Sequence, residues 1–493
     1  MAESDPRRRG LILAICCMSL FIVGLDVTIV NVALPSMRDD LHASMSDLQW
    51  IGDAYTLVLA SLLMLGGSSG DRFGRRRTFQ TGLVLFTLGS LLCGLAPGLG
   101  WLVAARMLQA VGGSMLNPVA MGIITNTFTD PRERARAIGV WGATVGMSMA
   151  LGPVLGGVLT ASLGWQAIFL VNIPVGLAAL VLAGRYVPES RAPRPRRFDP
   201  AGQALVALLL ATLTYGIIEG PAAGWGSTRT VACFAVAFAA LIGLLVCESR
   251  REEPLIELGF FRSAPFSGAT VIAVCGFAAM SGFLFLNTLY LQEVRGFSAL
   301  RAGLYPLPMA VMTIVCAPIS GRIVGSRGGR IPLVAAGVGI AASGLLFTGL
   351  SATTPTWQLL LAYLVFGIGF GMLNAPITAT AVAGMPRAQA GVAAAVASTS
   401  RQVGQSLGIA VIGSVVGSAV HGSMRTGLAP ASHVGWWIVA GCGAAIVSLG
   451  ILTTGRWAAG TAQRAADELN PEQTRTPTPD HGRERDSAAH GAA

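Results

Sequence analysis

The sequence contains very little charge. Only 12% of its 493 residues are charged and 53% are hydrophobic, whereas a soluble globular protein carries about 25% charged residues. Lysine is absent, so arginine supplies every strong positive charge and gives a formal net charge of +10. This composition argues against a soluble enzyme or binding domain. It indicates an integral membrane protein, most of which lies in the bilayer.

Motifs for metal, disulfide and nucleotide binding are also missing. The eight cysteines lie in or beside apolar segments, and no Cys-x-x-Cys or Cys/His spacing occurs, so we expect neither disulfides nor metal sites. No GxxxxGK[ST] loop is present, which argues against ATP as the energy source. The arginines fall in short clusters between apolar runs, a pattern that reflects membrane topology rather than nucleic-acid binding.

Long apolar runs follow one another along almost the whole chain. A helix needs about 20 apolar residues to cross the hydrocarbon core, and runs of that length predict about fourteen helices. The runs cover residues 11–34, 47–67, 79–98, 101–123, 137–160, 166–186, 200–219, 230–248, 267–290, 303–322, 331–350, 357–380, 390–419 and 434–455. The first run lacks a small-residue cleavage pattern, so we expect it to remain as a spanning helix.

The arginine clusters predict the orientation of these helices. Each cluster falls in the N-terminal tail, in an even-numbered connection or in the C-terminal tail: 7–9, 72–77, 132–136, 191–197, 250–262, 322–330, 387 and 456. Odd-numbered connections are poor in arginine. Because arginine-rich loops stay in the cytoplasm, we expect both termini in the cytoplasm of a bacterial cell and the helices in its plasma membrane.

The connection after the second expected helix, GGSSGDRFGRRRT, combines glycines, an acid and arginines. Glycine permits close helix approach and tight turns, and the acid can pair with an arginine or face a helix N-terminus. The frame resembles the signature loop of the major facilitator superfamily. The resemblance implies a conformational latch rather than a substrate site, formed by Gly67, Asp71, Arg72, Gly74 and Arg75.

A segment in the fifth expected helix, GVWGATVGMSMALGPVLGG, is rich in small residues. Its glycines can pack closely against a neighbouring helix, and its proline can kink the segment. The end of the segment resembles the motif of drug:proton antiporters within this superfamily, carried here by Gly152, Pro153, Gly156 and Gly157. The resemblance implies an interface sealed against proton leak. Simple packing, with no bearing on transport direction, is the alternative.

Two ionisable residues lie within apolar runs of the first and fourth helices. Asp26 stands in GLDVTIVNVALP, at a cost of about 3 kcal/mol near the bilayer centre. Its stretch resembles the first-helix motif of the fourteen-helix branch of drug:proton antiporters. Arg106, with Gln109, resembles the family's proton-relay motif. The resemblance implies a proton or cation site at Asp26. A helix–helix hydrogen bond from Asn31 or Arg106, or a purely structural ion pair, is the alternative.

Further polar residues accompany this pair. Counting at 1.5 Å per residue places Asp53 about 9 Å from the outer end of the second helix, a depth similar to that of Asp26 and Arg106. Asp53 is either an extra acid in the transport pathway or an outward-facing interfacial charge. Arg401 and Gln402 lie in STSRQVGQSLG, which resembles a thirteenth-helix signature of the same branch. They are candidates for gating or for structural hydrogen bonding.

The resemblance covers residues 10 to 455 and implies two six-helix bundles with two helices inserted between them. A degenerate copy of the signature loop, GRIVGSRGGR at 321–330, agrees with two related halves. The expected divisions are an N-terminal tail (1–10), a first bundle (11–187), a linker (188–199), two inserted helices (200–248), a loop (249–266), a second bundle (267–455) and a tail (456–493), disordered beyond a short amphipathic start.

The implied function is export of hydrophobic or cationic small molecules, including drugs, in exchange for protons. No cofactor or enzymatic activity is expected, since the proton gradient would be the driving force. The expected partners are the small molecule, protons and the lipid bilayer, and the chain is expected to act as a monomer. A dedicated exporter of a natural product made by the host is an alternative, and a proton-coupled importer is a further one.

Overall fold

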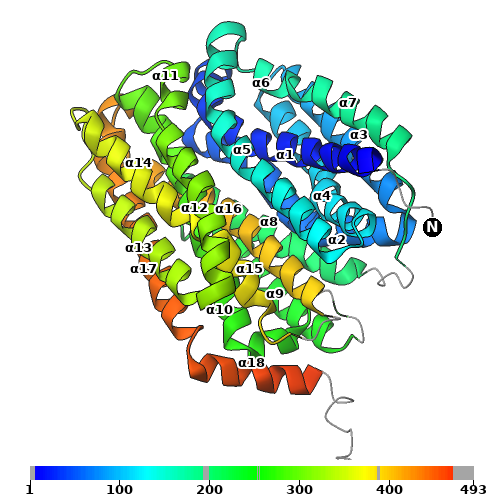
Figure 1. Ribbon diagram of the computed structural model, residues 1–493. Coiled ribbons are helices and arrows are strands. Elements are labelled where there is room, and N and C mark those ends of the chain that lie inside the picture. Colours follow the sequence, from blue (N-terminus) through cyan, green and yellow to red (C-terminus); the bar gives the residue numbers. More distant parts are fainter. Residues whose placement is uncertain (1–5, 193–198, 252–253, 255, 386–388, 470–493) are drawn as a thin grey trace, which may run out of the picture.

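The chain folds into long helices that form two bundles side by side (Figure 1). The computed structural model describes residues 6–192, 199–251, 254, 256–385 and 389–469. Within these ranges, thirteen helical segments are long and apolar enough to cross a membrane. A further helix, α3 (Arg75–Gly94), has a polar start that lowers its mean hydropathy, but it packs between α4 and α7 inside the first bundle. Together they give the expected fourteen, and the expected fold class is confirmed.

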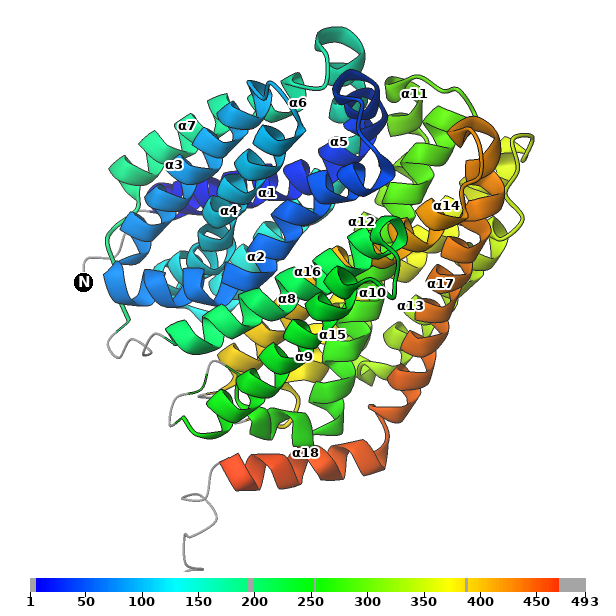
Figure 2. The same cartoon turned by 180° about the vertical axis from the view of Figure 1, so that it is seen from behind.

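The first bundle contains six helical spans, and the last of them is interrupted. Its helices are α1 (Pro6–Leu41), α2 (Met45–Phe73), α3, α4 (Leu99–Thr127), α5 (Pro131–Leu163), and the short α6 (Ala167–Leu170) followed by α7 (Asn172–Tyr186). The inserted pair comprises α8 (Pro200–Ala223) and α9 (Thr228–Ser249). Figure 2 shows this pair alongside α2 and the second bundle, and α8 contacts both α2 and α16.

The second bundle also has six spans, several of which change helix type or break near a proline. Its elements are α10 (Ala264–Leu289) with the π-helix η2 (Tyr290–Val294), α11 (Ala299–Leu304) with α12 (Leu307–Arg327), α13 (Arg330–Phe347), α14 (Thr356–Gly371) with α15 (Asn374–Val382), α16 (Ala390–Ala419) and α17 (Met424–Leu452). A short 3-10 turn, η1 (Leu258–Arg262), precedes the bundle and α18 (Arg456–Leu469) follows it.

The helices begin where polar side chains can satisfy free backbone N–H groups. At the start of α2, the Ser44 hydroxyl accepts from the Asp47 N–H, and the Asp47 carboxylate accepts from the Ser44 N–H. Asp130 caps α5 and Asp199 caps α8 more simply, since each carboxylate accepts from backbone N–H groups of the first turn, and each is followed by proline. Such caps stabilise a helix by about 1 kcal/mol, so short polar connections fix where each apolar span begins.

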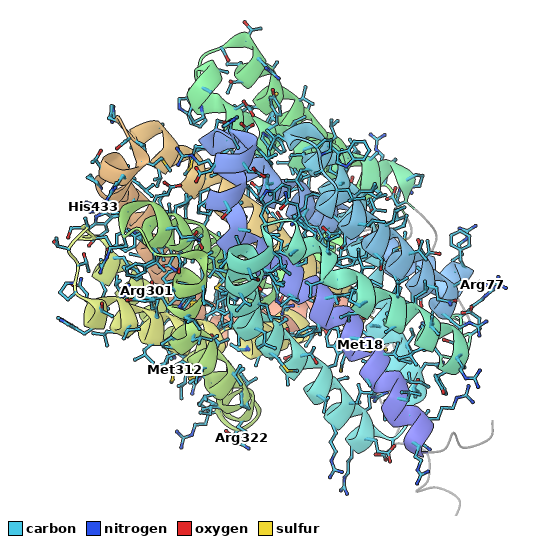
Figure 3. All side chains as sticks on the ribbon, turned by 90° about the horizontal axis from the view of Figure 1, so that it is seen from above. Met18, Arg77, Arg301, Met312, Arg322 and His433 are labelled. Atoms are coloured by element: carbon cyan, nitrogen blue, oxygen red, sulfur yellow. The ribbon has the colours of Figure 1, made fainter. Side chains whose placement is uncertain are left out.

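The arginine-rich ends of the helices gather opposite the end where α1 gives way to α2. We call the α1–α2 end the outer end, after the orientation that the arginines predict. At the inner end, Arg77 of α3 and Arg322 of α12 project from the edges of different bundles (Figure 3). The α12–α13 turn that carries the degenerate loop has Gly328 in the left-handed region, with φ +79°, a conformation that glycine adopts easily.

The two bundles touch at their outer ends. Arg38 Nη1 of α1 lies 2.9 Å from Glu293 Oε1 of η2. Next to it, the Gln292 side chain donates to the Val32 carbonyl oxygen across the same interface, at 2.7 Å. Further contacts join α5 to α11 and α2 to α16. The described conformation is therefore closed at the outer end.

The C-terminal segment begins with the expected amphipathic helix. This helix, α18, crosses beneath the second bundle in Figure 1. It is held there by an ion pair between Arg262 and Glu468, at 2.5 Å, and by a hydrogen bond from the Ala264 N–H to the Thr461 hydroxyl, at 3.0 Å. Trp457, in the first turn of this helix, is 66% exposed. The rest of the expected disordered tail lies outside the described residues.

Candidate functional site

Asp26 and Arg106 form a buried ion pair in the middle of the first bundle. Arg106 Nη1 lies 2.5 Å from Asp26 Oδ2, and the two side chains are 2% and 0% exposed. Arg106 also donates to Gln109 Oε1 at 2.7 Å and to the Ile51 carbonyl oxygen at 3.2 Å. Because a charge out of water is costly unless it is paired and hydrogen-bonded, these contacts explain how both ions can lie in the membrane.

Three neutral polar residues complete this arrangement. Gln109 Nε2 donates to Asp26 Oδ1 and to the Ser90 hydroxyl, both at 2.8 Å. Asn172 Nδ2 of α7 lies 3.3 Å from Asp26 Oδ1. Asp26, Ser90, Arg106, Gln109 and Asn172 are called the Asp26 network below. The network connects α1, α3, α4 and α7, and each member, backbone and side chain together, is at most 1% exposed.

Aromatic rings cover the guanidinium of the network. The Arg106 Cζ atom lies 4.4 Å from the centre of the Tyr55 ring and 5.7 Å from that of Phe169. A cation over an aromatic face is attracted by the ring quadrupole, most strongly where water is excluded. The rings therefore stabilise the charged arginine while they separate the ion pair from solvent.

Close helix crossings bring the network together. A Cβ atom on Gly89 of α3 would lie 2.6 Å from the Gln109 Cα atom of α4. Three residues further along α4, a Cβ atom on Gly112 would overlap the Phe86 backbone of α3. Only glycine permits this approach, and it places Ser90, the residue after Gly89, within reach of the Gln109 amide.

The resting network balances its charges. One carboxylate faces one guanidinium, and the remaining members are neutral, so the described site has no excess negative charge to attract a cation. Protonation of Asp26 would remove the negative partner of Arg106. Breaking a buried ion pair in this way costs about 3–5 kcal/mol, which is enough to shift the equilibrium between two conformations of a protein.

Asp53 does not belong to this network, although it lies at a similar depth. Its side chain is fully buried, so it is not an outward-facing surface charge. Its Oδ1 atom accepts from the Thr56 hydroxyl at 3.2 Å, and Ser406 of α16 lies beside it. Residues two apart on a helix point to different sides. Tyr55 therefore faces Arg106 while Asp53 faces the second bundle.

The glycines of the expected antiporter motif lie where α5 meets two other helices. A Cβ atom on Gly152 would overlap Thr28 of α1, and one on Gly156 would lie 2.9 Å from the Ile29 carbonyl oxygen. On the next face, a Cβ atom on Gly157 would lie 2.7 Å from the Leu300 Cα atom of α11. The motif thus packs α5 against α1 within its own bundle and against the second bundle.

Pro153 takes part in the contact between bundles. A Cβ atom on Gly303 of α11 would overlap the Pro153 carbonyl oxygen, so the two backbones touch there. Proline residues in a helix leave one backbone hydrogen bond unmade.

The signature loop forms a compact inner-end structure. Asp71 Oδ1 accepts from Arg75 Nη2 at 2.9 Å, and Arg75 Nη1 donates to the Gly122 carbonyl oxygen of α4 at 3.2 Å. Gly74 has φ +112°, which favours glycine. Gly67 faces Pro118 of α4, since its Cβ atom would lie 3.4 Å from Pro118 Cβ. Arg72 is exposed in the last turn of α2.

The segment after α7 docks onto this loop. Glu189 Oε1 accepts from the Arg76 N–H at 3.1 Å, at the start of α3. The Ser190 carbonyl oxygen accepts from the Arg75 N–H at 2.9 Å. The linker between the bundles is therefore attached to the expected latch.

Arg401 and Gln402 lie on α16, away from the Asp26 network. Arg401 Nη2 donates to the Thr378 hydroxyl of α15 at 2.5 Å. Its Nε atom and the Gln402 Oε1 atom are buried and have no hydrogen-bond partner among the described residues. The expected structural hydrogen bond thus exists for one end of Arg401 only.

The structure also places Asn31, the alternative partner of Asp26, and a further acid, Glu219. Asn31 donates to the Val27 carbonyl oxygen of its own helix, at 2.9 Å, and Arg106 is the ionic partner of Asp26. Glu219 of α8 accepts from the Trp50 ring N–H of α2 at 2.8 Å. Glu219 therefore attaches the inserted pair to the first bundle.

The sequence-based interpretation did not include Ser90, Asn172 and Tyr55. Each is a polar residue within an apolar run, and this is the signal that could have identified it. The sequence does not show toward which neighbouring helix each of these side chains points. Only that direction distinguishes a network member from a residue that bonds to the backbone of its own helix.

Comparisons with known proteins agree on one family. Residues 16–409 match the Major Facilitator Superfamily. The fold is also similar to a solved bacterial homologue of the human drug peptide transporters PepT1 and PepT2. That likeness has a TM-score of 0.65 and 14% sequence identity, and it covers 93% of this chain and 99% of the other. At this identity the structural likeness concerns the fold alone.

Several curated relatives are named for resistance or export. The tetracenomycin C resistance and export protein of Streptomyces glaucescens is 40% identical over 404 residues, which cover 82% of this chain and 75% of the relative. The multidrug resistance protein Stp of Mycobacterium tuberculosis is 36% identical over 81% of this chain and 74% of its own. The methylenomycin A resistance protein of Bacillus subtilis is 33% identical over 82% of this chain and 87% of the relative.

Proposed function

The chain belongs to the Major Facilitator Superfamily, and from that membership we propose that it exports small organic molecules by exchange with protons. Members of the family are secondary transporters, and relatives that align with most of this chain are named as resistance or export proteins. The proposed mechanism is alternating access, in which one bundle rocks against the other. The proposed location is the plasma membrane, with both termini in the cytoplasm.

The observation that carries the proton-coupling proposal is the ion pair between Asp26 and Arg106, at 2.5 Å. In the proposed cycle a proton binds Asp26 when the site opens to the outer side. Arg106 then loses its negative partner while it keeps Gln109 and the Ile51 carbonyl oxygen. The network must rearrange, because an unmatched buried cation is unfavourable. Release of the proton on the inner side restores the pair.

The contacts at the outer end fit a state that loads cargo from the inside. Arg38 and Glu293 join the bundles there, and Gly157 packs against α11. In the other half of the cycle these contacts would open, and the signature loop would act as the latch at the inner end. The Asp71–Arg75 pair and the docked Glu189 are the contacts that such a latch would rearrange.

The proposed cargo is an apolar organic molecule. Arg106 already matches the charge of Asp26, so Asp26 would not by itself select a cationic cargo, and an apolar dye that carries a positive charge is still a usable reporter. A second candidate function is dedicated export of one natural product made by the host. It is favoured by a relative whose name includes both resistance to and export of tetracenomycin C. A proton-coupled importer has no comparable support.

The experiment uses inverted membrane vesicles with an inside-acid gradient and ethidium as the reporter dye. The native chain is compared with Asp26→Asn and with a matched control, Asp39→Asn, which changes an exposed acid on the same helix. We expect dye accumulation by the native chain and the control, and none by Asp26→Asn. Accumulation that survives in Asp26→Asn would show that Asp26 does not couple proton movement to transport. Accumulation that ignores the gradient would contradict antiport.

A further inference from the structure

Arg401 is a membrane-embedded cation without an acidic partner among the described residues. It lies eleven residues after the start of α16 at Ala390, which is about 16 Å along the helix. Of the ion pairs between described residues, none includes Arg401. A guanidinium carries five N–H donors, and the only hydrogen bond described for this one goes to the Thr378 hydroxyl.

The contrast with Arg106 shows what is missing. Arg106 meets a carboxylate, an amide oxygen and a backbone carbonyl, and two rings cover it. Among the described residues Arg401 meets one hydroxyl, and its Nε atom is buried without a partner there. A charge in the membrane is costly and faces a partner, a bundle interior or a water-filled space. The half-buried Arg401 side chain has its donors in place, and no anionic group of the described segments faces it.

Other unpartnered polar groups surround this position. The Oε1 atoms of Gln402 and Gln405 are buried and have no hydrogen-bond partner within the described part of the chain. Gln405 follows Arg401 by four residues, so the two side chains share one face of α16. The oxygen and nitrogen of an amide are interchangeable by rotation, and each amide can therefore turn its NH2 group toward an anion.

This group of residues faces the junction of the two bundles. Gly404 and Gly408 hold one side of α16 against α10, where their Cβ atoms would lie 2.9 Å from Val274 Cα and 2.6 Å from Ala278 Cα. Arg401 contacts α15 on another side. Ser406 lies beside Asp53 of α2, which belongs to the first bundle. A cargo held between the bundles would meet these side chains.

We propose that Arg401, with the amides of Gln402 and Gln405, binds an anionic group of the cargo, such as a carboxylate or a phenolate. A guanidinium forms two parallel hydrogen bonds with a carboxylate, which gives both strength and orientation. This inference rests on the proposed export function and assigns it a substrate class, an apolar molecule with one acidic substituent. The Asp26 network would carry the proton, and Arg401 would carry the cargo.

The test measures equilibrium binding of two dyes to the purified chain in lipid nanodiscs by fluorescence anisotropy. Fluorescein is anionic and rhodamine 6G is cationic, and both share a xanthene core. The variants are Arg401→Gln and Arg401→Lys. The matched control is Arg464→Gln, which changes an exposed arginine of α18. We expect Arg401→Gln to weaken fluorescein binding about tenfold or more, with rhodamine 6G binding unchanged or tighter.

Arg401→Lys should fall between the native chain and Arg401→Gln, since lysine keeps the charge and loses the planar fork. Fluorescein affinity that is equal in the native chain and Arg401→Gln, including no binding by either, would overturn the site. An equal loss of both dyes would overturn it as well, because this result indicates a structural role for Arg401.

A second measurement needs no variant and therefore does not depend on whether Arg401→Gln folds. Benzoate should displace fluorescein from the native chain, and the neutral isostere benzamide should not. Equal displacement by the two rejects the anion site. Gradient-driven ethidium transport without charge-selective binding would reject this inference and leave the proposed function standing. Charge-selective binding without any gradient-driven transport would reject the proposed function and leave the anion site standing.

Discussion

Arg38 of α1 and Glu293 of η2 form an ion pair that joins the two bundles at their outer ends, with 2.9 Å between Nη1 and Oε1. The side chains are 29% and 19% exposed, so the pair is partly shielded from water. A pair of this kind contributes up to about 1 kcal/mol. It favours the conformation that is closed on the outside.

Charge reversal at this pair should open the outer end. Arg38→Glu places two acids together, so we expect the closed population to fall, and Arg38→Glu combined with Glu293→Arg should restore it. The measurement is double electron–electron resonance, which gives the distance between spin labels at His42 and Gly296, two exposed residues beside the pair. The eight native cysteines are replaced first, so that only these two positions carry a label. A distance distribution that is the same in all three chains would show that the pair does not bias the equilibrium.

Removal of Arg106 should destabilise the protein more than removal of both charges. Arg106→Gln leaves Asp26 buried and unmatched, which costs about 3–5 kcal/mol. The double variant with Asp26→Asn keeps two neutral, hydrogen-bonding side chains at the same place. We therefore expect a larger fall in the unfolding temperature for the single variant, measured by tryptophan fluorescence in detergent. Equal falls in the unfolding temperature of the two variants would mean that Arg106 does not stabilise the charged form of Asp26.

A methyl group at Gly157 should separate α5 from α11. Its Cβ atom would lie 2.7 Å from the Leu300 Cα atom and from the Ala299 carbonyl oxygen, and backbone atoms can move only if the helices move apart. We expect Gly157→Ala to disfavour the outer-closed state and to slow transport. The control is Gly142→Ala on the same helix, where no atom lies within 4 Å of the added Cβ. At that position alanine is about 1 kcal/mol more favourable than glycine in a helix. The added methyl group meets no neighbour, so transport should be retained.

Loss of the Glu189 carboxylate should release the linker from the signature loop. Glu189 accepts from the Arg76 N–H at 3.1 Å, and its Oε2 atom lies 3.9 Å and 3.8 Å from the side chains of Arg76 and Arg77. This is a helix cap, and its removal costs about 0.5–2 kcal/mol. In Glu189→Ala, which removes the acceptor for the Arg76 N–H together with the charge, we expect faster hydrogen exchange over residues 75–78. Glu133→Gln, which removes a pairing with Arg9 elsewhere at the inner end, should leave that exchange unchanged.

The sequence by itself determined the spans and their number, and the degenerate copy of the signature loop predicted two related halves. Apolar length sets a membrane helix, because an unsatisfied backbone cannot lie in hydrocarbon. Sequence also indicated that Asp26, Asp53 and Arg106 lie at similar depths, since helical rise converts residue counts directly into distance.

Only the tertiary structure decided which of these residues meet. Asp26 reached Arg106, and Asp53 turned toward α16, two residues from the ring that covers the arginine. In the same way, the sequence placed Arg401 on a helix but could not indicate that no acid of the described chain pairs with it. The physical reason is that a helix apolar on all sides has no preferred face in a membrane. Its rotation is set by close crossings such as Gly89 against Gln109, which exist only once the helices have packed.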